Sequence, residues 1–190
     1  MCALTLIGVT GHFVSYTFIV VIIRDIVGVT GPNLAWLLAA YGVAGLAAMG
    51  LLARPGDRHP KAAIVGCLAG LTAVFSLLAA LGWSGERTGG VVLAGVVAVV
   101  AWGATATAMP PMLQSAAMRH SPDDPDGASG LYVAAFQVGI MAGSLIGGVL
   151  IERAGLSLML AVSALLVAAV LAGVLAGPDL FPATPATRGE

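Results

Sequence analysis

Charged residues are confined to short segments between long apolar runs, and this distribution constrains the fold more than any other feature of the sequence. A helix needs about 20 apolar residues to span the hydrocarbon core of a bilayer. Six runs meet that requirement, at residues 3–23, 34–52, 62–81, 91–118, 127–151 and 156–176. The sequence therefore predicts an all-α membrane protein with six transmembrane helices. We expect residues 1–176 to form one six-span bundle, and residues 177–190, rich in Pro, Ala and Thr, to form a disordered tail.

Composition agrees with this class and argues against several others. Apolar residues make up 59% of the chain and charged residues 9%, whereas soluble domains average about 25% charged residues. A formal net charge of -1 argues against a nucleic-acid partner. Cys2 and Cys67 form no spaced motif, and no cluster of His, Cys and carboxylates suggests a metal or another cofactor. No nucleophile–base pair occurs at membrane depth, so we expect no enzymatic activity.

The distribution of Lys and Arg predicts the orientation. With six spans, the side that holds the N-terminus carries five basic residues and the other side carries three. Three of the five, Arg54, Arg58 and Lys61, share one loop. Basic loops favour the cytoplasm, so both termini are expected there, with the tail at 177–190 also cytoplasmic.

A weak internal repeat connects the two halves of the chain. An acid–Arg pair follows the second run at Asp57-Arg58 and the fifth run at Glu152-Arg153, and a six-span topology places these pairs on opposite membrane faces. Secondary transporters contain inverted three-helix repeats of this kind. Helix ends often carry charges, however, and this simpler explanation stays open.

His12 is the one ionisable residue near the centre of a predicted span. Tyr16 follows four positions later, so both side chains fall on one helix face together with Thr5. This stripe favours a face that lines a central aqueous cavity, where His12 and Tyr16 would contact a bound molecule. A neutral histidine hydrogen-bonded between helices is the alternative, and a proton-carrying role is a further possibility.

The fifth run has two different faces. Gly139, Gly143 and Gly147 recur at every fourth position and predict a ridge for close packing of a neighbouring helix. Gln137 lies about a third of a turn away, near mid-depth. An unpaired amide in hydrocarbon is costly, so Gln137 is expected to contact either a bound molecule or another helix.

Two further polar residues are candidates for the lining of the cavity. Gln114 follows the Pro110-Pro111 pair and would lie near the inner mouth, and Tyr41 lies in the middle of the second run. For Tyr41, packing against a neighbouring helix is an equally good interpretation.

The chain resembles the C-terminal half of a major facilitator superfamily transporter, and most of all the arabinose-efflux-like branch that exports drugs and sugars. The order and spacing of several segments carry the resemblance, at residues 11–17, 41–45, 57–61, 111–114 and 133–137. Such transporters have about twelve spans in two halves, so the resemblance implies half of a twelve-helix fold. The chain departs from the family pattern at Ala53, where a glycine is usual, and at Pro55.

The resemblance also gives the loop at residues 50–61 a possible role. In the family, charges in this loop pair with neighbouring helix ends and lock one gating state, which here would involve Asp57, Arg58 and Lys61. A basic patch that merely sets the topology is the alternative.

Together these features predict a half-size or truncated secondary transporter. The resemblance implies efflux of a small drug or sugar-like molecule across the bacterial inner membrane by alternating access, with binding near the bilayer midplane. Coupling to protons, and a partner such as an N-terminal half or a second copy of this chain, follow from the same resemblance. The alternative is a non-transporting membrane remnant or scaffold that associates with another membrane subunit.

Overall fold

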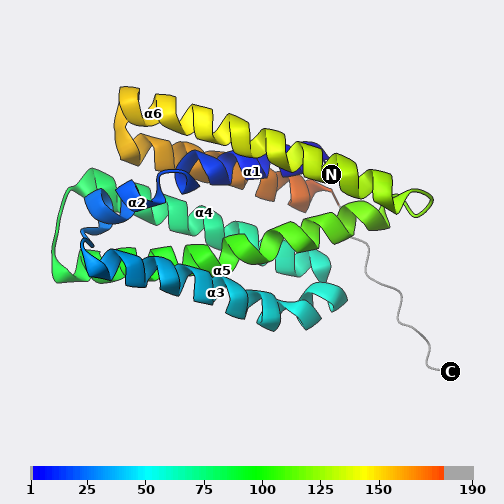
Figure 1. The fold of residues 1–190 in the computed structure, drawn as a ribbon, viewed down its shortest axis with the longest axis horizontal. Helices are drawn as coiled ribbons and strands as arrows, with labels where there is room; N and C mark the ends of the chain where they lie inside the picture. The colour runs from blue at the N-terminus through cyan, green and yellow to red at the C-terminus, as the bar shows by residue number, and fades with distance from the viewer. Residues whose placement is uncertain (1, 178–190) are drawn as a thin grey trace.

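The structure, a computed structural model, describes residues 2–177 apart from the side chains of Pro55 and Asp57 (Figure 1). The all-α class is confirmed, because each regular element in this range is a helix. The tail expected at residues 177–190 lies outside the described residues except for Gly177. The elements are α1 (Cys2–Tyr16), α2 (Ile19–Ile22), the π-helical turn η1 (Ile23–Val27), α3 (Pro32–Arg58), α4 (Pro60–Ser84), α5 (Gly89–Arg119) and α6 (Pro125–Ala176).

The helices lie side by side, roughly along the long axis of the bundle (Figure 1). Helices α3, α4, α5 and α6 are each long and apolar enough to cross a membrane, and α1 with α2 and η1 forms a further, bent span. Helix α6 has 52 residues and reverses at Gly155, where φ is 83°. At about 1.5 Å per residue it would extend roughly 78 Å if straight, more than twice the bilayer core, so its arms at 125–154 and 156–176 are separate crossings.

The first span is broken, which the sequence did not indicate. Helix α1 ends at Tyr16, and the segment from Ile19 to Val27 is bent away from it by 51°. Neither proline nor glycine lies at the break. Instead, the Thr17 hydroxyl donates to the carbonyl oxygen of Phe13 at 3.0 Å and forms a hydrogen bond with Ser144 Oγ at 2.8 Å. Side-chain bonds of this kind compete with the backbone ladder.

The polar loop expected at residues 50–61 is mostly helical, which corrects the predicted boundary. Helix α3 continues to Arg58, and the chain leaves helical geometry at His59, whose φ and ψ are -135° and 63°. A residue that precedes proline is disfavoured in the α region, so Pro60 explains this position. Asp124 and Thr88 accept backbone hydrogen bonds at the starts of α6 and α5, as residues at N-caps commonly do.

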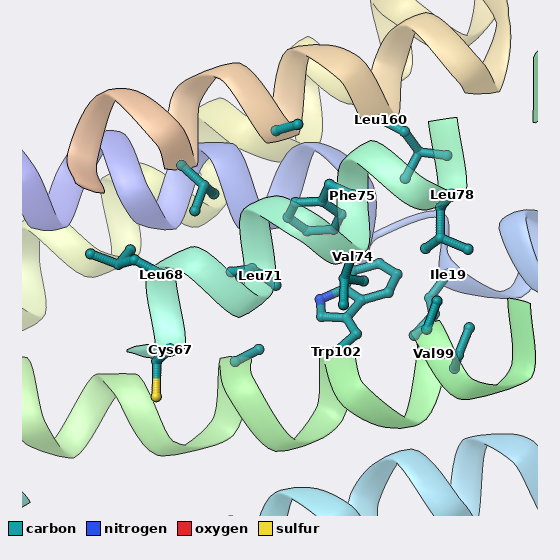
Figure 2. Packing of buried hydrophobic residues seen from close by; sticks show 14 of the residues in the cluster. Ile19, Cys67, Leu68, Leu71, Val74, Phe75, Leu78, Val99, Trp102 and Leu160 are labelled. Carbon is teal, nitrogen blue, oxygen red and sulfur yellow. The ribbon is translucent and has the colours of Figure 1, made fainter. Parts of the chain in front are cut away.

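The helices pack in two layers, one formed by α1 with the arms of α6 and the other by α3, α4 and α5 (Figure 1). Helix α1 lies between the two arms of α6, with Gly143 against Thr10 on one side and Gly11 against Leu166 on the other. Figure 2 shows the second layer, where Phe75 of α4 meets Trp102 of α5 within the buried cluster. Their ring centroids are 4.9 Å apart and the rings are nearly perpendicular, a favourable geometry for aromatic pairs.

Candidate functional site

An apolar cavity of about 250 Å³ lies where α1, α3, α4, α5 and α6 meet. Aromatic and aliphatic side chains form most of its wall, and a few polar groups point into it. The lining residues on which the following argument depends are His12, Phe13, Tyr16, Tyr41, Thr107 and Phe136. Mostly apolar walls with a small number of placed polar groups are typical of small-molecule sites.

His12 is held by aromatic rings on several sides. Its ring stacks on Tyr16, with centroids 5.1 Å apart and an interplanar angle of 24°, and it meets Phe13 edge-on at 5.1 Å. The indole nitrogen of Trp102 donates a hydrogen bond to His12 Nδ1 at 3.2 Å. The imidazole is therefore fixed in position by α1 and α5 together.

Tyr16 and Tyr41 bring two phenol rings to the same wall. Their centroids are 5.9 Å apart, and each also contacts Trp102 edge-on. Tyr16 is 36% exposed, as expected for a side chain that borders an open cavity. The stripe expected on the first span thus does bring His12 and Tyr16 to one cavity.

Close packing of α3 on α5 explains how Tyr41 reaches this position. Gly103 lies directly against the carbonyl oxygen of Tyr41, and Gly45 lies against the side chain of Thr107. A Cβ atom on either glycine would collide with its neighbour. Both glycines therefore permit the short helix separation that joins the two sides of the cavity.

The proline pair of α5 shapes the end of the cavity. Pro110 lines it, and its carbonyl oxygen accepts a hydrogen bond from the Tyr132 hydroxyl at 2.9 Å. This bond joins Tyr132 of α6 to the backbone of α5 at the proline pair, and the contact ties α6 to the wall of the cavity.

The cavity carries no formal charge from the residues that line it. None of its lining residues is Asp, Glu, Lys or Arg, and neutral polar groups such as Thr107 and the two phenols provide its hydrogen-bonding capacity. Within residues 2–177, no three His, Cys, Asp or Glu side chains lie close enough together to hold a metal ion.

The two candidate glutamines lie outside this cavity. Gln114 donates to Ser129 Oγ at 2.9 Å and links α5 to the start of α6. Gln137 is exposed on the N-terminal arm of α6. Its neighbour Phe136 lies in the cavity wall instead. Nothing in the sequence distinguished Phe136 from the other apolar residues of this span, so it was not predicted as a site residue.

The charged loop borders a second hollow of about 240 Å³. Gly56 and Pro60 line this hollow together with Ser115 and Arg119 of α5. Lys61 donates from Nζ to the carbonyl oxygen of Gly177 at 3.2 Å, where α6 ends. Arg58 is exposed, and the side chain of Asp57 is not described. Lys61 therefore contacts a helix end, as the expected gating loop would require, but no ion pair of the loop is visible in the described residues.

Gly139, Gly143 and Gly147 lie against α1. A Cβ atom on Gly143 would be 2.6 Å from the Thr10 carbonyl oxygen, and one on Gly139 would be 2.9 Å from Val9. Gly147 lies directly against the carbonyl oxygen of Val14. All three are buried, so the first span approaches α6 at backbone distance along about two helical turns.

Comparison with known proteins places the chain in a family. The model of the Major Facilitator Superfamily matches residues 1–190. A chloramphenicol efflux pump of Mycobacterium tuberculosis is 60% identical over 98% of this chain and 45% of the pump. An uncharacterised transporter of the same superfamily from Bacillus subtilis is 30% identical over 80% of this chain and 37% of its own length.

A probable sugar efflux transporter of Haemophilus influenzae is 33% identical over 80% of this chain and 37% of its length. The chain thus spans less than half the length of these curated relatives. The six-crossing bundle, the family model and the 60% identity agree, and the chain belongs to the Major Facilitator Superfamily.

Proposed function

We propose that this chain forms one six-helix half of a transporter that exports a small neutral molecule across the bacterial inner membrane. The observation that carries the proposal is the uncharged aromatic cavity between α1, α3 and α5. In this superfamily, two six-helix halves rock around a site near the midplane. His12, Tyr16 and Tyr41 would form one wall of that site, and the remaining length of the protein would supply the other.

The chemistry of the wall supports a neutral aromatic substrate over a sugar. Aromatic faces provide large contact areas for another ring, and none of the lining residues is Asp, Glu, Lys or Arg. The similarity to chloramphenicol efflux pumps supports a drug of that kind. Gln114 and Gln137 lie outside the cavity, and we assign them contacts between helices or with the other half rather than with substrate.

We propose that the protein transports its substrate without changing it chemically. We also propose that both termini of this chain lie in the cytoplasm. In residues 2–177 the carboxylates lie at or near helix ends, so a carboxylate that carries protons would have to come from the other half. His12 is the ionisable side chain near mid-span in this half. The loop formed by Asp57, Arg58 and Lys61 would stabilise one gating state through the ends of neighbouring helices. The contact from Lys61 to Gly177 supports that role.

Accumulation of radiolabelled chloramphenicol tests the proposal. The chain would be expressed within its full-length protein in a susceptible bacterial strain, in wild-type form and with Tyr41→Ala or Ser76→Ala. Tyr41 lines the cavity, whereas Ser76 is exposed on α4, so the first variant should raise drug accumulation and the second should not. Equal accumulation in cells with and without the wild-type protein would overturn the proposal and favour a non-transporting scaffold.

A further inference from the structure

We propose that Trp102 fixes His12 as a neutral hydrogen-bond donor, and that the site therefore selects uncharged aromatic molecules carrying an oxygen acceptor. This inference rests on the proposed function for its substrate, but not for the state of the histidine. Trp102 is a positioning residue in this proposal, since it acts through His12.

The indole N–H determines which ring nitrogen carries the proton. An indole nitrogen donates a hydrogen bond and cannot accept one. Because Trp102 Nε1 donates to His12 Nδ1 at 3.2 Å, Nδ1 must present its lone pair. A neutral imidazole has one N–H, so the proton of His12 resides on Nε2.

The surroundings of His12 keep this arrangement in place. Trp102 is fully buried and cannot rotate without disturbing its contact with Phe75. The imidazole is stacked on Tyr16 and is edge-on to both Phe13 and Trp102. A ring flip would therefore break the hydrogen bond and several aromatic contacts together.

The remaining nitrogen is available to a ligand. No residue in the range 2–177 forms a hydrogen bond with His12 Nε2. Within the same range, the fully buried side-chain nitrogen without a partner is Arg119 Nε, so Nε2 of His12 is not sealed from the cavity that the residue lines. An N–H that lacks a partner in an apolar cavity is costly unless a ligand satisfies it.

The nearby groups define the class of ligand. The titratable groups that share the wall with His12 are the phenols of Tyr16 and Tyr41, while α4, α5 and α6 present Leu68, Thr107 and Phe136. A carbonyl or nitro oxygen would accept from Nε2–H while the attached ring stacks among the aromatic side chains. A cation would find no carboxylate there and could not accept the Nε2–H bond.

Nitrogen-15 NMR of the protein in detergent tests the state of His12 directly. In the wild-type protein, His12 should be protonated at Nε2 and unprotonated at Nδ1. Signals are assigned with His12→Gln, while His59→Gln and His120→Gln should leave the His12 signals unchanged. A proton on Nδ1 of His12 in the wild-type protein would overturn the proposal whatever the protein transports.

The Trp102→Phe variant tests the positioning role. Phenylalanine keeps most of the ring packing but has no N–H, so a second population protonated at Nδ1 should appear. A His12 spectrum identical to that of the wild type would show that Trp102 does not select the tautomer. If this variant fails to fold, the wild-type spectrum still shows which nitrogen of His12 carries the proton.

A matched pair of ligands tests the acceptor. Acetophenone and α-methylstyrene have the same shape, but the second has a methylene group where the first has the carbonyl oxygen. Acetophenone should move the Nε2–H proton of His12 downfield, and α-methylstyrene should not; equal shifts would overturn the acceptor requirement.

In transport assays of the full-length protein, His12→Leu should lower export of acceptor-bearing substrates roughly fivefold more than His12→Gln, which keeps a donor. Absence of any export would contradict the proposed function and leave the NMR result standing.

Discussion

At the residue scale, two pairs of hydroxyl groups link α1 to the two arms of α6. Ser15 of α1 and Ser163 of α6 are both fully buried, and their hydroxyl oxygens are 2.7 Å apart. Thr17 forms a similar pair with Ser144 on the other arm of α6. These two contacts flank Tyr16, so α1 is fixed to both arms at the point where it breaks and where Tyr16 enters the cavity.

The buried serine pair gives the first prediction. Ser15→Ala leaves the Ser163 hydroxyl without its partner, so the free energy of unfolding in detergent should fall by about 0.6 to 1.7 kcal/mol. Ser15→Ala combined with Ser163→Ala should cost less than the sum of the single changes, because no unsatisfied hydroxyl remains. Ser76→Ala, on the exposed side of α4, is the control. Additive losses in the double variant would show that the two hydroxyls do not interact.

At the element scale, the contact between α1 and the N-terminal arm of α6 depends on glycine. Gly139, Gly143 and Gly147 place the two backbones in contact along about two turns. Without a hydrophobic driving force between helices in lipid, close packing of small residues is a major source of association. The cavity wall formed by α1 thus depends on a helix contact that lies behind it.

Gly143→Leu should disrupt this contact. A Cβ atom there would lie 2.6 Å from the Thr10 carbonyl oxygen and 2.9 Å from the Phe13 Cβ atom, so the helices must separate, at a cost of about 1 to 3 kcal/mol. Folded yield and thermal stability by size-exclusion chromatography provide the measurement. Gly66→Leu is the matched control, because Gly66 is exposed and has nothing within 4 Å of the added atom. Equal damage from both substitutions would contradict the packing role.

Long elements of this fold could be predicted from the sequence, whereas their local interruptions could not. The apolar runs located the spans because the bilayer demands a fixed length of uncharged chain. The break after Tyr16 depends on tertiary hydrogen bonds of Thr17 rather than on proline or glycine, and the extension of α3 to Arg58 depends on where Pro60 starts α4. For the same reason, the face of α6 that Gln137 occupies could not be predicted, because it depends on how α6 is rotated against its neighbours.

At the scale of the whole molecule, the helices differ in how many of their residues are buried against other helices. In the most apolar segment of α3, 17% of the residues are buried, compared with 39% to 44% in the corresponding segments of α4, α5 and α6. Lipid covers apolar side chains on the α3 face, whereas the exposed polar residues Gln137 and Tyr16 lie on α6 and α1. Exposed amides and phenols are costly in hydrocarbon, so these residues are expected to face protein or a water-filled cavity.

The even number of crossings gives a prediction about orientation. Lys61 reaches Gly177, so the start of α4 and the end of α6 lie at the same end of the bundle, and the loop between α4 and α5 lies at the other (Figure 1). Reporter fusions after Glu190 and within residues 85–88 should therefore report opposite sides of the membrane, with the first in the cytoplasm. Signals from the same side would contradict the six-crossing arrangement.

The last prediction concerns what the 190-residue chain does by itself. The superfamily transports by rocking two halves around a site between them, and this chain spans 45% of the chloramphenicol efflux pump to which it is similar. Under the proposed function, it would provide one wall of the site and could not close the other. We therefore expect the isolated chain either to self-associate, covering the surface around Gln137 and Tyr16, or to require a separate partner half, and in both cases to lack transport alone.

Purification in detergent, followed by mass measurement and reconstitution into vesicles, tests this expectation. A dimer that dissociates in the Gln137→Leu variant but not in the Gln114→Leu variant would identify the covered surface, because Gln114 is paired internally with Ser129. Restoration of saturable export by the remaining part of the full-length protein would show that a partner half completes the site. A stable monomer with substrate-saturable export of its own would contradict the expectation, since one wall would then suffice for alternating access.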